Sequence, residues 1–277
     1  MEVLTSPSNP RVKLWASLKE RKYRERTGLY LVEGVRSIET YLEAGIAFDA
    51  VVLDAYSARS DALFELADRC EERDIDVIEV SSSVFSQIAD TEHSQGIIAV
   101  VKKTEGNLAD LFSSPHDAAL AQGNCSDVIL VADQIRDPGN LGTMIRTADA
   151  VMARGVVVTS GSVDVFNPKV VRASMGSLAH VSMARGSVDA VITACKDTGY
   201  RIVCADAHAE HSLFNVALVG PTVLVIGGET QGVSAQWKAA GADVVHLPMP
   251  GQTESLNAGM ATSVILYEAL RQRGTKR

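Results

Sequence analysis

The sequence predicts an α/β protein whose C-terminal part contains a mainly parallel sheet. Short runs of Val, Ile and Leu alternate with segments of helical periodicity, a pattern typical of βαβ units. In the second half these runs are apolar at nearly every position, as expected of strands that are covered on both faces. With 277 residues, of which 46% are hydrophobic, the chain is long enough to bury one large core or two smaller ones.

The first half contains four predicted strands and three predicted helices. We expect the strands at 29–34, 49–54, 75–80 and 96–103, and the helices at 35–43, 58–73 and 82–88. A stretch rich in Ser, Gly, Asn and Ala, with little periodicity, follows at 104–126. We therefore divide the chain into an N-terminal α/β domain over 1–105, a linker over 106–125 and a larger α/β domain over 126–277.

The second half repeats the alternation of strand and helix. We expect strands at 127–133, 155–159, 201–206, 222–228 and 243–249, and helices at 141–153, 187–199 and 255–273. In a parallel α/β sheet, ligands bind outside the carboxyl ends of the strands. The candidate site therefore lies in the loops that follow Asp133, Thr159, Asp206, Gly227 and Met249.

Charge and composition narrow the class of protein. The net charge of −8 argues against extensive non-specific nucleic-acid binding, yet residues 1–30 hold seven basic and three acidic side chains. This basic start is compatible with phosphate contacts and equally with a solvated helix face. The four cysteines are scattered without a C-x-x-C pair, which predicts neither disulfides nor a zinc site. No apolar run of about 18 residues and no apolar N-terminal signal occurs, so we expect a cytoplasmic protein without a membrane partner.

Two of the loops carry polar groups next to glycines. In the loop that follows the strand 127–133, Asn140 is a candidate helix cap, and Arg146 lies six residues further on in the helix. In "VIGGETQGVS", Gly227 and Gly228 permit close approach of the backbone to a ligand, and Glu229 stands at the carboxyl end of a strand. This order of glycines is not the G-x-G-x-x-G fingerprint of dinucleotide binding.

The third loop opens the last helix. In "GQTESLNAGMATSVILYEALRQR", Ser255 or Thr253 is a candidate cap. The predicted core-facing residues of the helix recur at helical spacing: Leu256, Met260, Val264 and Tyr267. Small residues at Ala258, Gly259 and Ala261 indicate either tight helix packing or clearance for a cofactor or a second subunit.

The histidines near residue 210 do not predict a metal site. His208, Glu210 and His211 stand close together without the spacing of the metal-binding H-E-x-x-H helix. We expect a polar surface loop there and no bound metal.

Taken together, the three loops resemble a known family. "NLGTMIRTADA", "VIGGETQGVS" and "LPMPGQTESLNAGMATSVILYEALRQR" are similar, in order and spacing, to the three signature motifs of the SpoU/TrmH branch of the SPOUT RNA methyltransferases. The segment "FNPKVVRASMGSLAHV" is also similar to that family, and the N-terminal half resembles its RNA substrate-binding domain, a small ribosomal-protein-like α/β sandwich. The resemblance implies an α/β-knot domain with a deep trefoil knot over 126–277.

The resemblance also implies an activity and residues that perform it. Members transfer a methyl group from S-adenosylmethionine to a ribose 2′-hydroxyl of rRNA or tRNA. Arg146 matches an arginine proposed as base or electrostatic activator, although a guanidinium, which stays protonated in proteins, is a poor base. The other implied catalytic residues are Asn140, Glu229, Ser255 and Asn257. The implied cofactor-binding residues are Gly227, Gly228, Leu247, Met249, Leu256 and Ala261.

The implied partners are RNA and a second copy of the chain. The candidate RNA-binding residues are Arg11, Lys13, Lys19, Arg21, Lys22 and Arg172. We expect 23S rRNA as the substrate, with tRNA as the alternative, and a homodimer through the final helix and the first-motif helix. Two other functions stay open: a non-catalytic RNA-binding or ribosome assembly factor on the same fold, and a nucleotide-dependent oxidoreductase.

Overall fold

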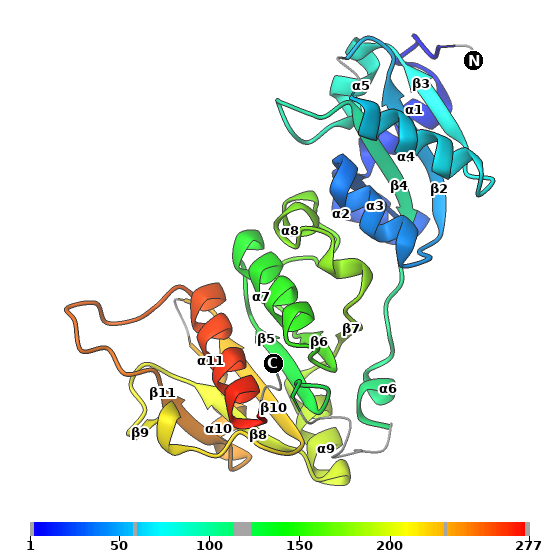
Figure 1. Cartoon of the computed structure of the whole chain (residues 1–277). Helices are drawn as coiled ribbons and strands as arrows, with labels where there is room; N and C mark the ends of the chain where they lie inside the picture. The colour runs from blue at the N-terminus through cyan, green and yellow to red at the C-terminus, as the bar shows by residue number, and fades with distance from the viewer. Residues whose placement is uncertain (1–2, 58–59, 114–122, 230–231, 275–277) are drawn as a thin grey trace. The chain divides into compact units, whose positions relative to one another are not determined.

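The computed structural model of the protein describes residues 3–57, 60–113, 123–229 and 232–274, which form two compact units (Figure 1). Unit 1 combines Met1–Thr104 with Asp164–Ala179, and unit 2 combines Glu105–Val163 with His180–Arg277. The break after residue 104 lies next to the boundary expected at 105. The segment 164–179 differs from the expectation, because it folds with unit 1 and not with the C-terminal domain.

Unit 1 is built on a mixed four-stranded sheet in the order β1-β4-β2-β3. Strands β1 and β2 both run antiparallel to β4, and β2 runs parallel to β3. The four strands lie within the four predicted segments or within one residue of them: β1 Leu29–Glu33, β2 Phe48–Asp54, β3 Val77–Val80 and β4 Ile97–Lys102.

Helices cover both faces of this sheet. Helices α1 (Pro10–Ser17) and α5 (Ser82–Ile88) bury Trp15 and Phe85 against alternate strand residues such as Leu31. The intervening strand residues face the other way, where Tyr30 contacts Tyr41 of α3 (Val35–Glu43) and α4 (Asp61–Glu71) packs beside α3. Two of the three predicted helices, α3 and α5, have the bounds expected from the sequence.

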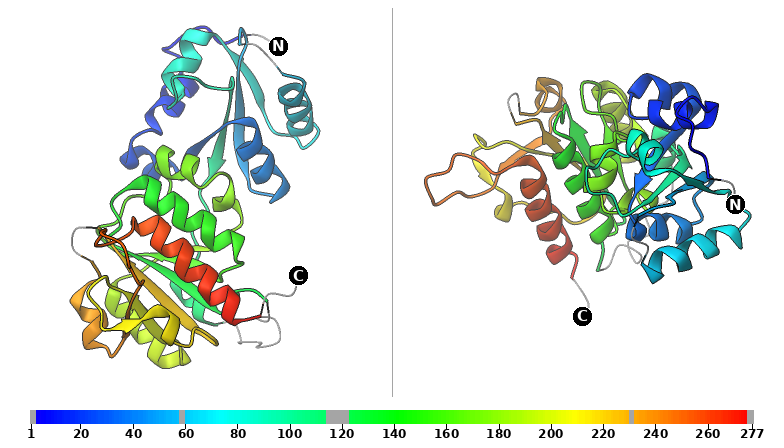
Figure 2. Two further views of the ribbon diagram at one scale, coloured as in Figure 1. Left: turned by 60° about the vertical axis from the view of Figure 1, so that its left-hand side comes forward. Right: turned by 90° about the horizontal axis from the view of Figure 1, so that it is seen from above.

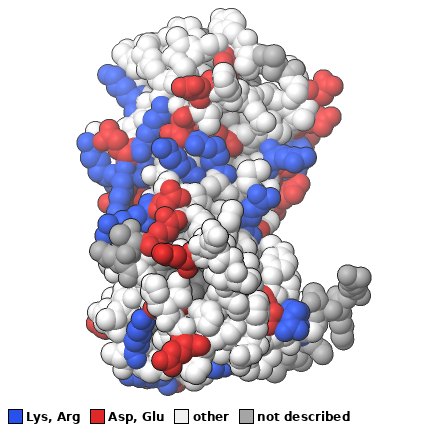
Figure 3. Space-filling model, turned by 90° about the vertical axis from the view of Figure 1, so that its left-hand side faces the viewer, with Lys and Arg blue, Asp and Glu red and all other residues white. Residues whose placement is uncertain are grey.

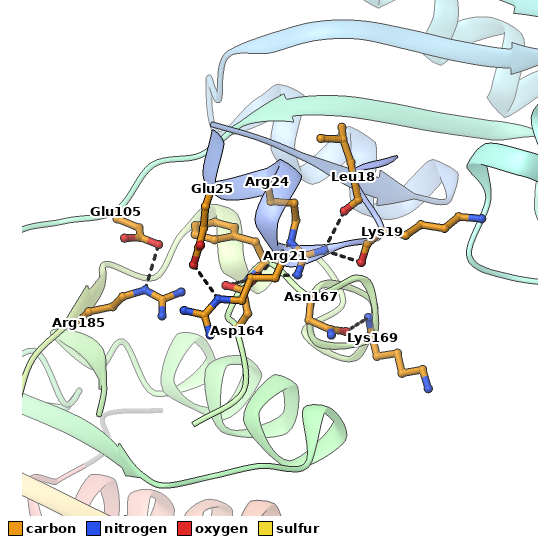
Figure 4. Close-up of polar contacts among 11 residues, drawn as sticks. Leu18, Lys19, Arg21, Arg24, Glu25, Glu105, Asp164, Asn167, Lys169 and Arg185 are labelled. Carbon is orange, nitrogen blue, oxygen red and sulfur yellow. Dashed lines mark hydrogen bonds and ion pairs between the residues drawn. The ribbon is translucent and has the colours of Figure 1, made fainter. Parts of the chain in front are cut away.

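The segment 164–179 completes unit 1 at strand β1. It contains α8 (Pro168–Ala173) and a short 3₁₀ turn at Ser177–Ala179, and Phe166 packs on Tyr30 with ring centroids 4.7 Å apart. Asp164 pairs with Arg24 of α2 (Arg21–Thr27) at 2.7 Å, and Arg24 also donates to the carbonyls of Leu18 and Lys19 (Figure 4). Arg24, which the sequence grouped with the basic N-terminal residues, is therefore a buried structural group.

Unit 2 contains a seven-stranded sheet in which every pair is parallel, as the sequence predicts. The strand order is β7-β6-β5-β10-β8-β11-β9, so β10 lies between β5 and β8 in the middle of the sheet. The strands are β5 Val128–Asp133, β6 Gly155–Val158, β7 Met183–Arg185, β8 Arg201–Ala205, β9 His211–Ser212, β10 Thr222–Gly227 and β11 Asp243–His246.

The two faces of this sheet carry different helices. Helices α6 (Leu108–Ser113), α9 (Val188–Thr198) and α10 (Ala235–Ala239) bury one face. Helices α7 (Pro138–Ala150) and α11 (Ala258–Gln272) pack side by side on the other (Figure 2). Helix α6 corrects the predicted linker over 106–125: Leu111 and Phe112 are core residues, and 114–122 lie outside the described residues.

Helix α11 presents a different face to the core than its sequence suggests. Ile265, Leu266 and Ala269 are buried, together with the small residues Ala258 and Gly259. The four residues predicted to face the core are instead partly exposed: Leu256 36%, Met260 62%, Val264 40% and Tyr267 53%. Small side chains let the opposite face approach α7 and the sheet closely, which leaves the larger residues outside.

No helix among the described residues is long and apolar enough to span a bilayer. The α/β class and the mainly parallel sheet are confirmed. The trefoil knot stays a prediction.

Candidate active site

The site forms where β5 and β10 end next to each other in the sheet. Asp133, the last residue of β5, is fully buried. Its carboxyl oxygens accept hydrogen bonds from the hydroxyl of Thr159, the indole of Trp237 and the backbone N–H of Ser234. These bonds tie together the loops that follow β5, β6 and β10, and so fix the floor of the site. Asp133 marks the end of a predicted strand but is not among the predicted site residues.

Glu229 follows the end of β10 and brings two predicted residues together. Asn140 donates its side-chain amide to Oε1 of Glu229 at 2.7 Å, and Asn257 donates to the same oxygen at 3.1 Å. Asn140 lies in the first turn of α7 and is 6% exposed. One carboxylate therefore joins the beginnings of α7 and α11, far apart in sequence, at the end of a central strand.

The caps of these two helices differ from the predicted ones. Asp137, not Asn140, caps α7, and its side chain accepts the backbone N–H of Asn140 at 2.8 Å. Asn257, not Ser255 or Thr253, caps α11 by accepting the N–H groups of Gly259 and Met260. The amide of Asn257 therefore has two roles: its Oδ1 accepts the backbone N–H groups at the cap, and its Nδ2 donates to the Glu229 carboxylate.

A cavity of about 430 Å³, here called the larger cavity, opens beside Glu229. All six residues predicted to bind a cofactor line it, from the ends of β10 and β11 and from the start of α11. Ser255 and Glu229 line it as well. Such a volume is within the range that small-molecule sites use.

Glycines in the second motif are required by close backbone contacts. A Cβ on Gly228 would lie 2.7 Å from the carbonyl oxygen of Gln134, and one on Gly227 would overlap the backbone of Gly232. Gly259 in α11 also packs closely, because a Cβ there would lie 3.0 Å from Thr143 of α7. Of the three small residues noted in the sequence, Gly259 therefore serves helix packing, whereas Ala258 and Ala261 line the larger cavity.

The loop that follows β8 contributes residues that the sequence analysis did not assign to the site. Asp206 and His208 line the larger cavity, and Lys238 pairs with Asp206 at 2.6 Å. The hydrogen bond from Lys238 lowers the pKa of the Asp206 carboxyl below its ordinary value of 3.8. The expected polar loop is exposed at His208, Glu210 and His211, but His208 also faces the cavity. The position of Asp206 at a strand's carboxyl end was the available signal.

A second cavity of about 220 Å³, here called the smaller cavity, adjoins the first. It is lined by Gln134, Ile135, Arg136, Asp137, Asn140, Gly228 and Glu229. Gly228 and Glu229 belong to both cavities. Two molecules bound in them would therefore meet at Glu229.

Arg146 is exposed on α7 and lines neither cavity. It lies six residues after Asn140, which corresponds to about 9 Å along the helix axis and to a different face. The structure thus brings together four of the five predicted catalytic residues, namely Asn140, Glu229, Ser255 and Asn257, and leaves Arg146 outside.

The predicted RNA-binding residues lie in unit 1, and most are ion-paired there. The pairs are Arg11–Asp76, Arg21–Glu25, Lys22–Glu20 and Arg172–Asp90. Lys13 is exposed and Lys19 is half-buried. Basic and acidic side chains are intermixed on the face drawn in Figure 3, so the surface there is not uniformly positive.

Comparison with known proteins agrees with this geometry. A model of the SpoU rRNA Methylase family matches residues 127–267, and a model of the MRM3-like substrate binding domain matches residues 9–99. The 23S rRNA (guanosine(2553)-2′-O)-methyltransferase RlmP of Bacillus subtilis is 30% identical over 268 residues, which cover 96% of this chain and 98% of the relative.

Two further relatives extend the likeness. The 23S rRNA (uridine(2479)-2′-O)-methyltransferase of Streptomyces viridochromogenes is 33% identical over 273 residues, covering 96% of this chain and 91% of the relative. The AdoMet-bound rRNA methyltransferase from Sinorhizobium meliloti has a similar structure, with a TM-score of 0.84 at 28% identity over 98% of this chain and 97% of that one. The resemblance found in the three motifs is confirmed, and the chain belongs to the SpoU rRNA methylase family.

Proposed function

We propose that this protein transfers a methyl group from S-adenosylmethionine to a ribose 2′-hydroxyl of 23S rRNA, in the cytoplasm. The observation that supports this most directly is the pair of adjoining cavities with a shared wall at Gly228 and Glu229. Methyl transfer needs donor and acceptor held in line, and two adjacent pockets supply that arrangement. Two relatives that match nearly the whole chain are named as 23S rRNA 2′-O-methyltransferases, which favours rRNA over tRNA.

In this proposal the larger cavity holds the cofactor. Backbone groups and small or apolar side chains from Gly227, Leu247 and Leu256 would surround it, and Asp206 offers a carboxylate to its polar groups. The bound cofactor supplies the electrophilic methyl group. Ser255 lines the same cavity, and the side-chain amides of Asn140 and Asn257 orient Glu229.

Unit 1 is proposed to hold the RNA. Lys13 and Lys19 make no ion pair with any described residue, and the paired Arg11, Arg21 and Lys22 are exposed enough to exchange their acidic partners for phosphates. Arg172 is available in the same way. Replacing Lys13 by Ala should weaken binding to RNA of any sequence. It should also reduce the slope of the logarithm of the association constant against the logarithm of the salt concentration by about 1.

We also propose a homodimer in which Arg146 acts on the site of the second copy. Arg146 lies outside both cavities of its own chain, on a helix that packs against α11. Helix α11 exposes Met260, Val264 and Tyr267 at helical spacing, an apolar stripe that a second copy would cover. A site completed in this way explains why an arginine of the first motif stands apart from Glu229.

Mixing inactive variants tests this dimer. Arg146→Ala and Glu229→Ala should each be inactive alone and should regain activity when co-expressed, because one of the two sites in a mixed dimer then has both residues. Light scattering should give twice the chain mass, and Tyr267→Lys should reduce it to a monomer. Activity from a monomeric Tyr267→Lys variant would contradict the shared site.

Transfer of labelled methyl groups tests the function itself. The pure protein, with labelled S-adenosylmethionine and 23S rRNA from a strain that lacks the gene, should label one 2′-hydroxyl. Normal cofactor binding without transfer to rRNA or tRNA would favour the assembly-factor function. Calorimetric binding of NAD in place of S-adenosylmethionine would favour the oxidoreductase.

A further inference from the structure

The reaction must remove a proton from the acceptor, and the structure offers one carboxylate at the required place. Glu229 and Gly228 are the two residues, among those described, that line both cavities. With the cofactor in the larger cavity and the acceptor ribose in the smaller one, Glu229 lies beside the point where the methyl group would pass from the cofactor to the ribose. This argument rests on the proposed function.

The two carboxylate oxygens of Glu229 differ in their hydrogen bonds. Oε1 accepts both asparagine amides, at 2.7 Å and 3.1 Å, whereas no described residue donates to Oε2. The orientation of the Asn257 amide is fixed, because its Oδ1 accepts the N–H groups that begin α11. Nδ2 must therefore face Glu229. The carboxylate is held in one orientation by one oxygen and keeps the other oxygen available.

The other titratable groups at the two cavities are less suitable as bases. They are Arg136, Asp137, Asp206, His208 and Glu254.

Asp137, whose Oδ1 caps α7, lines the smaller cavity alone, and Asp206 is paired with Lys238 in the larger one. His208 and Glu254 line the larger cavity alone. Arg136, and Arg146 from either copy of the proposed dimer, carry guanidinium groups that do not give up a proton in proteins.

We propose that Oε2 of Glu229 accepts the proton of the ribose 2′-hydroxyl, the acceptor nucleoside occupying the smaller cavity. The 2′-oxygen forms its bond to the methyl carbon as the carbon–sulfur bond breaks and its electron pair returns to sulfur. The O–H bond breaks in the same event, and its proton passes to Glu229, which later releases it to water. The hydroxyl becomes strongly acidic as the new bond forms, so a carboxylate is basic enough in a concerted step.

Glu229→Gln separates proton acceptance from positioning. Glutamine keeps the Oε1 acceptor for both asparagines but is not a base. We expect kcat to fall by about 10²- to 10⁴-fold, with cofactor affinity unchanged by calorimetry. The rise of kcat with pH at the acid end of the wild-type profile should disappear. Glu210→Gln, an exposed acid that lines neither cavity, is the matched control and should keep both rate and profile.

A binding measurement without cofactor gives an independent readout. An rRNA fragment is prepared with ribose or 2′-deoxyribose at the position that the wild-type protein methylates. Removal of the 2′-hydroxyl should weaken binding to the wild-type protein about fivefold more than to Glu229→Gln, because a hydrogen bond to a charged acceptor is lost.

The outcomes separate the two proposals. Near-normal kcat and an unchanged pH profile in Glu229→Gln would overturn the role of Glu229 and leave the methyltransferase proposal intact. Absence of transfer by the wild-type protein would instead overturn the proposed function.

Discussion

Two carboxylates at the ends of neighbouring strands behave in opposite ways. Asp133 ends β5, is fully buried, and receives hydrogen bonds on both oxygens. Glu229 follows β10, is exposed, and receives hydrogen bonds from described residues on one oxygen only. A buried carboxyl with all its acceptors used stabilises the fold, whereas an oriented carboxylate with a free oxygen on a cavity is available for chemistry.

Replacing each acid by alanine should give the largest contrast. Asp133→Ala leaves the indole N–H of Trp237 and the backbone N–H of Ser234 without their acceptor. Each unsatisfied donor should lower the free energy of unfolding by about 1–3 kcal/mol. We expect a loss of about 3–5 kcal/mol in the free energy of unfolding. Glu229→Ala should cost about 1 kcal/mol or less, yet abolish transfer.

Urea unfolding followed by tryptophan fluorescence measures this difference. Trp237 reports on unit 2 and Trp15 on unit 1, and the chain has no other tryptophan. A shift in the Trp237 signal alone is expected for Asp133→Ala. Equal destabilisation by the two substitutions would remove the distinction between the two carboxylates.

Substitutions of Asn257 can separate its two roles, which are to stabilise α11 as its cap and to orient Glu229. Asn257→Ala loses the cap of α11 and should cost about 1 kcal/mol. Asn257→Ser restores a capping oxygen and most of that stability, but it cannot donate to Glu229 as the amide does. We therefore expect Asn257→Ser to be stable and strongly impaired in kcat. Full activity in the serine variant would mean that the amide donor does not orient Glu229.

Asp206 is intermediate between the buried Asp133 and the exposed Glu229, and its substitution should give the smallest effect of those considered. It is partly exposed, at 17%, and paired with Lys238, which lowers its pKa in the folded protein. A lowered pKa contributes stability at neutral pH, and this contribution is lost as the pH falls below the ordinary value of 3.8.

Asp206→Asn should therefore reduce stability at neutral pH by up to about 1 kcal/mol. The difference from wild type should shrink in unfolding experiments taken to about pH 3. A difference that grows as the pH falls would contradict the direction of the pKa shift.

The sequence alone was sufficient where local pattern decides the outcome. Apolar runs predicted the four strands of unit 1 and β5, β6, β8, β10 and β11 of unit 2, but not the short strands β7 and β9. The bounds of α3 and α5 followed from periodicity. The three motifs identified the family, and all six predicted cofactor residues line one cavity because they occur at the ends of adjacent strands or at the start of α11. Each of these features is determined by a short run of consecutive residues, so it can be predicted from the sequence alone.

Other features depend on which segments meet in space. Burial of Arg24 against Asp164 depends on contact between residues 140 positions apart. The exposure of Met260, Val264 and Tyr267 was decided by packing, because the face with the smaller side chains approaches α7 more closely. Sequence also identified Glu229 and both asparagines, but only the tertiary structure shows that both asparagines donate to one oxygen of Glu229 and that no described residue donates to the other. Hydrogen-bond partners far apart in sequence are a property of the fold, and that property distinguishes Glu229 from Asp133.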